Sequence, residues 1–222
     1  MTPEDEAYVL SLLARGLIKS PCLELGAGYG GPTAARFLVG RSIEVVGTDL
    51  SPASGVELVI DFEASRGDVL RAAQGRRFAT ALVLNVLEHT FQPVTVLDNV
   101  CALLEPGGRL VVVAPAAWPL HSFPQDCYRL LPDFYVKYSK TRELLVEANT
   151  FEYLGIGPVT SGPEARLPRP TTRKAFDFYS RVIHRVFNTT GRAHWAPPHL
   201  LIGMVMVVPG ELGGQHLDVH EP

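Results

Sequence analysis

Cys22-Leu23-Glu24-Leu25-Gly26-Ala27-Gly28-Tyr29-Gly30-Gly31 is the stretch of sequence that decides the fold. Its first four residues form a short, mainly apolar run and predict a buried strand. The glycines that follow predict a tight turn, and residues 32–38 are compatible with a helix. A strand, a glycine turn and a helix in this order bring backbone N–H groups and the start of a helix close to a ligand.

Two glycine patterns fit this turn. Gly26, Gly28 and Gly31 fit Gly-x-Gly-x-x-Gly, the pattern of dinucleotide-binding turns. Glu24, Gly26, Gly28 and Gly30 fit Glu-x-Gly-x-Gly-x-Gly. The glycines alone do not distinguish a site for a pyrophosphate from a site for a nucleoside with a charged tail. The choice therefore depends on the sequence downstream.

Three downstream stretches favour the second pattern. Residues 45–49, Val-Val-Gly-Thr-Asp, predict a second strand that ends in an acid. Residues 81–87 predict a further strand, which Glu88-His89 follows, and residues 104–110 contain a Leu-x-Pro-Gly-Gly turn before the next strand. In order and spacing, these stretches and the glycine turn resemble the motifs of the class I S-adenosylmethionine-dependent methyltransferases. The resemblance covers residues 20–115 well and the rest of the chain only loosely.

The expected fold is therefore α/β, a Rossmann-like doubly wound sheet, mostly parallel, with seven strands of which the last is antiparallel. Most of the predicted strands are continuous apolar runs, which is typical of parallel strands buried on both faces. Strands are expected at 22–25, 43–48, 56–60, 81–87, 109–114, 151–156 and 200–208. Helices are expected at 3–17, 32–38, 68–73, 93–104, 132–148 and 171–187.

Length and composition predict one domain over residues 1–222, since 222 residues fill one α/β domain and are few for two. About forty residues separate the last two strands, which is long for a hairpin. We expect residues 157–199 to be an insertion that covers the substrate or contacts a second subunit, and the latter would make a homodimer. Residues 210–222 are expected to be a frayed tail.

The bulk properties argue against several classes of protein. A formal charge of −3 and scattered arginines argue against nucleic acid or an anionic membrane as partner. The apolar runs are far too short to span a membrane. Cys22, Cys101 and Cys127 are too few and too far apart for a disulfide framework or a zinc site, which predicts reduced thiols in the cytoplasm and no metal. The acidic residues 1–6 predict no signal peptide.

The resemblance implies S-adenosylmethionine as cofactor, bound at the carboxyl ends of the strands. Asp49 is expected to accept hydrogen bonds from the ribose hydroxyls, because a vicinal diol suits a carboxylate, and Glu24 to bond either to backbone or to the methionine amino group. Gly28 lets the backbone pass close to the methionine part. Asp61 is expected near the adenine amino group, or else as a surface cap. The remaining cofactor residues are expected to be Gly26, Ala27, Tyr29, Leu50, Phe62 and Asn85.

Residues 121–132, after the fifth predicted strand, resemble the His-x-x-Pro-x-Asp-x-Tyr-Arg-x-x-Pro segment of small bacterial methyltransferases in glycan and natural-product pathways. His121 or Asp126 is predicted to face the acceptor and take its proton, with Tyr128 and Arg129 in substrate binding. The alternative is structural: Asp126 pairs with Arg129, and Tyr128 packs under the next helix.

His89 is a further candidate base, because the unperturbed pKa of histidine suits proton removal near neutrality. The same Glu-His pair occurs in relatives of different chemistry, which favours a scaffold or cofactor-side role.

Three functions remain open at this point. The first is methyl transfer from S-adenosylmethionine to an O, N or C nucleophile of a small molecule, in which the sulfonium charge activates the methyl group and the protein mainly orients the reactants. The second is a non-catalytic S-adenosylmethionine-binding or partner subunit of the same fold. The third is a nicotinamide-dependent oxidoreductase, against which the Leu-x-Pro-Gly-Gly turn and the absence of a Tyr-x-x-x-Lys pair argue.

Overall fold

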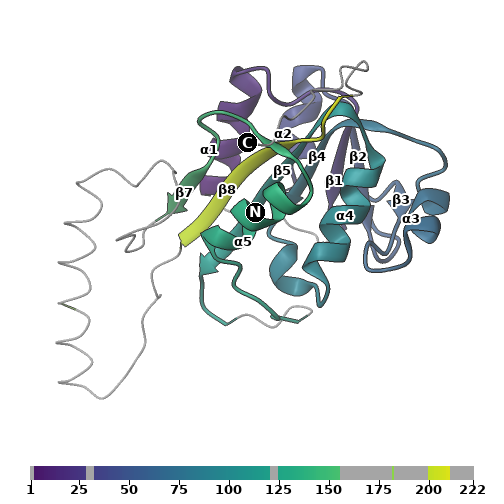
Figure 1. Cartoon of the computed structure of the whole chain (residues 1–222). Helices are drawn as coiled ribbons and strands as arrows, with labels where there is room; N and C mark the ends of the chain where they lie inside the picture. The colour runs from purple at the N-terminus through teal and green to yellow at the C-terminus, as the bar shows by residue number, and fades with distance from the viewer. Residues whose placement is uncertain (1–2, 29–32, 121–124, 156–181, 183–199, 211–222) are drawn as a thin grey trace, which may run out of the picture.

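The computed structural model describes residues 3–28, 33–120, 125–155, 182 and 200–210. Strands and helices alternate along these residues (Figure 1). The strands are β1 (Cys22–Leu25), β2 (Val45–Asp49), β3 (Leu58–Val59), β4 (Phe78–Leu84), β5 (Leu104–Ala117), β6 (Leu145–Val146), β7 (Glu152–Gly155) and β8 (Leu200–Val207). The helices are α1 (Pro3–Ala14), α2 (Ala35–Leu38), α3 (Arg66–Ala72), α4 (Pro93–Leu103) and α5 (Pro132–Thr141), with short 3-10 turns η1 (Val39–Arg41) and η2 (Leu87–His89).

The strands that the structure describes form one sheet in the order β3-β2-β1-β4-β5-β8-β6, and β7 also pairs with β8. β1 to β5 pair with one another in parallel, whereas β8 runs antiparallel to β5, β6 and β7. The chain starts in the middle of the sheet, winds outward to β3, and returns to β4 on the other side of β1. The prediction of a doubly wound, mostly parallel sheet with an antiparallel last strand is confirmed.

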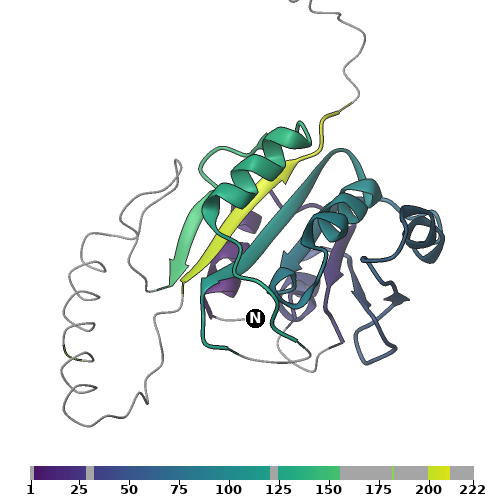
Figure 2. The same ribbon diagram turned by 60° about the horizontal axis from the view of Figure 1, so that its bottom comes forward.

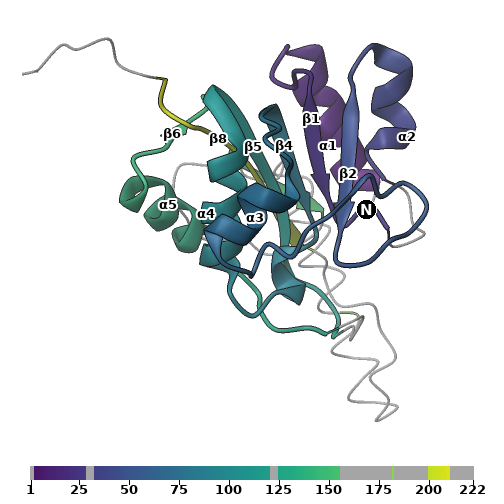
Figure 3. The same ribbon diagram turned by 90° about the vertical axis from the view of Figure 1, so that its right-hand side faces the viewer.

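Helices cover both faces of the sheet, so its central strands are buried on both sides. Helices α1 and α2 lie on one face and α3, α4 and α5 on the other (Figure 3). Within β5, Leu110 and Val112 pack toward the second group of helices, and Val111 and Val113 pack toward the first. The two cores are what the continuous apolar runs predicted.

The edge of the sheet differs from the expectation. The predicted helix 132–148 ends at Thr141, because Glu143 takes a positive φ of 54° and the Leu144 N–H bonds back to Ser139 O at 2.9 Å. Leu145 and Val146 then pair with β8 as the unpredicted strand β6. β6 pairs with one end of β8 and β7 with the other, and the residues between β6 and β7 form no strand. Two short strands therefore pair with β8 where the sequence predicted the single strand 151–156.

The fourth strand also ends earlier than predicted. β4 stops at Leu84 because Asn85 adopts a left-handed conformation, with φ 54°, that asparagine tolerates better than most residues. Its backbone N–H still bonds to Val113 O of β5 at 2.8 Å. Residues 87–89, of which the sequence places Leu87 in the strand, form η2 and turn the chain inward.

In the described part of the chain, none of the helices is long and apolar enough to cross a membrane. Apart from residue 182, the predicted insertion 157–199 and its helix at 171–187 lie outside the described residues, and so does the tail after residue 210.

Candidate active site at the carboxyl edge of the sheet

The carboxyl ends of the parallel strands meet at one edge, where open α/β sheets bind ligands at the point at which the strand order reverses. Here that point lies between β1 and β4. The start of α1, η2 and the segment after β5 gather at the same edge (Figure 2). Most of the predicted site residues that the structure describes lie at this edge, at the ends of different strands.

Glu24, in β1, is buried and holds the start of α2. Its carboxylate accepts hydrogen bonds from the backbone N–H groups of Ala34, at 2.6 Å, and Ala35, at 3.2 Å. Burial raises the pKa of Glu24, and these two hydrogen bonds oppose the rise. Of the two roles considered for Glu24, the structure contains the bonds to backbone. They place α2 behind the glycine turn, whose residues Tyr29 and Gly30 lie outside the described part of the chain.

Asp49 ends β2 and also binds the glycine turn. Its Oδ2 accepts the Gly28 N–H at 3.0 Å, and its Oδ1 accepts the Leu50 N–H at 2.7 Å. Each carboxylate oxygen has two lone pairs, so both oxygens retain acceptor capacity. A Cβ at Gly28 would lie 3.0 Å from Asp49 Oδ2 and 2.9 Å from Val56 Cγ2, so the fold itself requires glycine there.

Leu50 follows Asp49, and its side chain is 63% exposed. An apolar side chain left open beside a carboxylate suits a nucleoside, which presents a diol and an apolar ring. Gly26 lies close to the end of β4, since a Cβ at this position would be 3.3 Å from Val86 Cγ2. Ala27 is buried, and its N–H bonds to Thr48 O.

Asp61 and Phe62, after β3, separate in the structure. Asp61 is exposed and accepts the Glu63 N–H at 2.8 Å, which is a local cap of the kind considered as its alternative. Phe62 is 7% exposed and packs in the core under α3 and α4. Its carbonyl accepts the Asn99 side-chain N–H at 2.9 Å. The cofactor roles of both residues stay predictions, and Phe62 would have to act from the core.

Asn85 joins β4 to α1, which sequence reasoning did not foresee. Its Nδ2 donates to Asp5 Oδ2 at 2.6 Å, and the Asp5 side chain is fully buried. Asp5 is one of three acids in the first turn of α1, where acids suit the positive end of the helix dipole. The signal that could have singled it out is its place in an apolar helix face beside Tyr8, Val9 and Leu12, which are all buried.

His89 is tied to the segment after β5. Its Nδ1 donates to the Gln125 carbonyl at 2.5 Å, and Gln125 Nε2 donates to the His89 carbonyl at 2.8 Å. The Glu88 carbonyl accepts the Cys127 N–H at 2.7 Å. This pairing fixes residues 125–128 against η2. It makes His89 part of a scaffold, which is the alternative to its role as a base.

Asp126 and Arg129 form the ion pair that the structural alternative proposed. Arg129 Nη1 donates to Asp126 Oδ1, and Arg129 Nη2 donates to Asp126 Oδ2 at 2.6 Å. Arg129 also donates to the carbonyls of Trp118 and Pro119. The pair therefore ties residues 126–129 to the end of β5. His121 lies outside the described residues.

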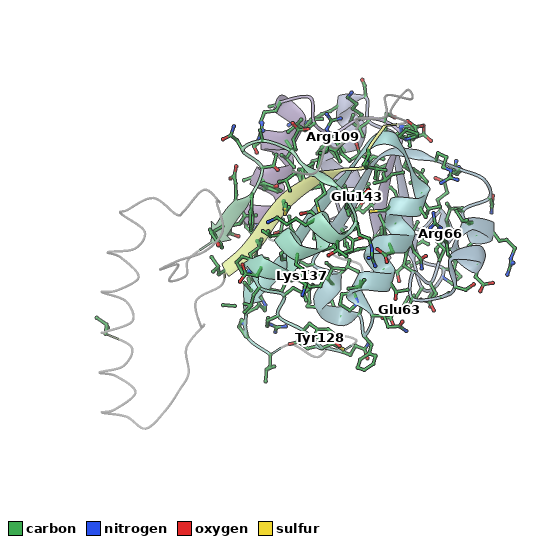
Figure 4. The ribbon with its side chains drawn as sticks, in the orientation of Figure 1. Glu63, Arg66, Arg109, Tyr128, Lys137 and Glu143 are labelled. Carbon is green, nitrogen blue, oxygen red and sulfur yellow. The ribbon has the colours of Figure 1, made fainter. Side chains whose placement is uncertain are left out.

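Tyr128 does not pack under the next helix. Its ring lies 6.4 Å from the Phe91 ring, its hydroxyl donates to the Phe91 carbonyl at 3.3 Å, and it stays partly exposed at the margin of the molecule, where Figure 4 also labels Glu63. Glu63 Oε1 accepts the Phe91 N–H at 2.8 Å. An open pair of aromatic rings thus borders the carboxyl edge of β4.

Glu88, for which the sequence suggested no separate role, also lies at this edge, in η2. It is 2% exposed, and no hydrogen-bond donor among the described residues reaches its Oε2. Burial raises the pKa of Glu88 to about 7. A hydrogen bond from its own backbone N–H and the charge of Arg129 oppose this rise in pKa, whereas Asp126 and Asp5 reinforce it. Its Oε1 lies 3.8 Å from His89 Nε2.

Glu88→Gln is expected to change how stability depends on pH. Because the pKa of Glu88 is higher in the folded chain than in the unfolded one, the folded state holds more protons between about pH 4.5 and 7, and its free energy of unfolding falls as pH rises through that window. The loss amounts to about 3 kcal/mol at most. Glutamine cannot ionise, so the variant should lack this loss and be more stable than the wild type at pH 8.

Urea unfolding of both proteins at pH 5, 6, 7 and 8 measures this difference. Glu105→Gln is the matched control, because Glu105 is exposed in the turn before the parallel part of β5, at the opposite edge of the sheet. Equal pH slopes for wild type and Glu88→Gln would contradict the assignment.

The described residues hold no cluster of three or more His, Cys, Asp or Glu side chains that could bind a metal ion. The same edge does offer what a nucleoside with a cationic tail requires. It has a carboxylate with free acceptor capacity at β2, an exposed apolar side chain beside it, and two buried acids, Asp5 and Glu88, near the carboxyl end of β4. The residues present therefore fit the cofactor that the resemblance implies.

Comparisons with known proteins bear on the family and the fold. Residues 23–110 match the family model described as a methyltransferase domain. The ubiquinone biosynthesis O-methyltransferase of Cereibacter sphaeroides is 32% identical over an alignment of 96 residues, and the match covers 39% of this chain and 38% of the relative. The match thus spans well under half the length of this curated relative, and the activity of the whole protein is not carried over from it.

Solved structures show the same fold. A SAM dependent methyltransferase from Archaeoglobus fulgidus superposes with a TM-score of 0.52 at 13% identity, covering 92% of this chain and 94% of that one. The Burkholderia thailandensis 1,6-didemethyltoxoflavin-N1-methyltransferase, solved with S-adenosylhomocysteine, superposes with a TM-score of 0.56 at 15% identity, covering 93% and 79%. At these identities the likeness concerns the fold.

Proposed function

We propose that this chain, which carries a class I S-adenosylmethionine-dependent methyltransferase domain, transfers a methyl group from S-adenosylmethionine to an O, N or C nucleophile of a small molecule. The observation that carries the proposal is the acid at the end of β2, bound to the glycine turn at the point where the strand order reverses. When bound, the cofactor supplies a methyl group on a positively charged sulfur.

The chain's own part in this reaction is orientation and desolvation. Asp49 accepts hydrogen bonds from the ribose hydroxyls, and the Leu50 side chain lies against the nucleoside. The hydrogen bond between Asn85 and Asp5 holds the end of β4 in the conformation that leads into η2. The Asp126–Arg129 ion pair holds residues 126–129, which we propose lie near the acceptor, against the end of β5. His121 remains our proposal for the group that takes the acceptor's proton.

The acceptor is proposed to be a small molecule of a glycan or natural-product pathway, as the resemblance of the segment 121–132 suggests. The aromatic pair Phe91 and Tyr128 at the border of the site supports an acceptor with a compact apolar part. The relatives' names include O- and N-methyltransferases of small molecules. A net charge of −3 argues against nucleic acid as partner. The three cysteines are free thiols, which supports a reducing, cytoplasmic location.

Asp49→Ala is expected to weaken cofactor binding by about ten- to a hundredfold, because losing a charge-assisted hydrogen bond costs about 1.5–3 kcal/mol. Calorimetric titration with S-adenosylhomocysteine measures the change in Kd. Asp133→Ala, an exposed acid in the first turn of α5, is the control and should bind normally. An unchanged Kd for Asp49→Ala would remove Asp49 from the site.

Titration with S-adenosylmethionine, S-adenosylhomocysteine and NAD tests the cofactor class itself. Incubation of labelled S-adenosylmethionine with small-molecule extracts then tests turnover. Cofactor binding with no labelled product would favour the non-catalytic S-adenosylmethionine-binding subunit, and binding of NAD alone would favour the oxidoreductase.

A further inference from the structure

Glu88 has a buried carboxylate oxygen, Oε2, to which the proposed function assigns no role. In the part of the chain that the structure describes, Oε2 is fully buried and receives no hydrogen bond. Burying an ionised carboxyl group that is short of hydrogen-bond donors costs much free energy, so such a group either keeps its proton or needs a positive charge nearby.

Ionisable groups from four elements face Glu88. Arg129 offsets the charge of Glu88 only in part, because both Nη atoms of Arg129 are hydrogen-bonded to the carboxylate of Asp126. Asp5 and Asp126 add negative charge. The Tyr135 hydroxyl is also buried without a partner among the described residues. Burial raises the pKa of Tyr135, and the negative charge of Glu88 raises it further. The groups are Asp5 of α1, His89 of η2, Asp126 and Arg129 after β5, and Tyr135 of α5.

The order of the strands relates the position of Glu88 to the charged end of the cofactor. Asp49, which we propose for the ribose, ends β2 on one side of β1, and Glu88 follows β4 on the other. A nucleoside whose ribose is held at β2 and whose base points toward β3 directs its 5′ substituent toward β1 and β4. This placement rests on the proposed function.

We propose that Glu88 makes this crevice prefer a cationic ligand, so that the sulfonium form of the cofactor binds with release of the Glu88 proton while the neutral thioether product does not. S-adenosylmethionine has one more positive charge than S-adenosylhomocysteine, and the two otherwise differ by a methyl group. A carboxylate in a buried setting interacts with that charge more strongly than one in water. Glu88 thereby helps the product to leave and the substrate to bind.

The expected result follows from proton linkage. Below about pH 7 a bound sulfonium must displace a proton from Glu88, so the affinity for S-adenosylmethionine falls as pH falls, while the affinity for S-adenosylhomocysteine stays level. The ratio of the two affinities is expected to fall by about tenfold between pH 8 and pH 5.5. In Glu88→Gln the ratio should be the same at both pH values.

Calorimetric titrations with each ligand at pH 5.5, 6.5, 7.5 and 8 test this, in two buffers with different ionisation enthalpies that count the protons released. Glu105→Gln is the control and should keep the wild-type pH dependence. Glu88→Asp should restore part of it. The proton count of the wild type is an independent measure, so the test does not depend on the folding of any variant.

Two outcomes would overturn the inference: a ratio that does not change with pH in the wild type, or the same change in Glu88→Gln. A failure of the proposed function looks different, because the wild type would then not bind S-adenosylhomocysteine at any pH.

Discussion

Gly47→Ala is expected to leave little folded protein, with a loss of more than about 4 kcal/mol in the free energy of unfolding. Gly47 lies in β2, directly opposite Glu24 of β1. A Cβ at this position would lie 2.0 Å from the Gly55 carbonyl oxygen and 2.8 Å from the Ala27 Cβ. The first of these neighbours is backbone, which cannot rotate away as a side chain can.

The neighbouring backbone is also held in place. The Glu57 N–H bonds to the Gly47 carbonyl at 2.8 Å, so residues 55–57 cannot retreat without breaking that bond. Urea unfolding measures the loss. Gly40→Ala is the matched control, because a Cβ there meets no atom within 4 Å, and it should change stability by no more than about 1 kcal/mol.

Any Gly47→Ala protein that does fold must have moved residue 27 or residue 55, and its affinity for S-adenosylhomocysteine should be lower than that of the wild type. Normal stability together with normal affinity would contradict the close approach between β2 and the turn at Gly55.

Asp126→Ala is expected to lower the free energy of unfolding by about 3 kcal/mol, because it leaves the Arg129 guanidinium without its carboxylate in a partly buried place. The side chain of Asp126 is 3% exposed and that of Arg129 22%. Thermal and urea unfolding measure the loss. Glu57→Ala removes the partner of Arg76 in a more exposed ion pair and should cost less than about 1 kcal/mol.

The same variant decides between the two roles considered for Asp126. If the pair is a brace, turnover per folded molecule and cofactor affinity should stay near the wild-type values, and Asp126→Asn should recover part of the stability. If Asp126 takes the acceptor's proton, turnover should fall by about 10²- to 10⁴-fold with little change in stability. The second result would contradict the brace.

Much of the fold could be predicted because the signals are local. Continuous apolar runs at 22–25, 45–48 and 109–114 indicate strands that are buried on both faces, and the glycine turn indicates the switch from strand to helix. The acids at the ends of β1 and β2 could be placed at one edge from the handedness of the crossovers alone.

The misplaced boundaries have tertiary causes. Residues 145–146 continue a helical pattern in sequence, yet they form β6 because β8, more than fifty residues later, offers them unpaired backbone groups. β4 ends at Leu84 because Asn85 turns left-handed, where its side chain donates to Asp5. Neither partner is near in sequence, so propensity and periodicity carry no trace of either contact.

The sequence by itself determined the class of fold, the edge at which a ligand binds and the residue types available there. Only the tertiary structure decided how those residues divide their work: Glu24 holds α2, Asp126 is bound to Arg129, and Oε2 of Glu88 is buried without a donor among the described residues. The physical reason is that apolar periodicity and glycine act within a few residues of the chain. The proton affinity of a carboxyl group instead depends on the water and charge around it, which for Glu88 are set by α1, the segment after β5 and α5.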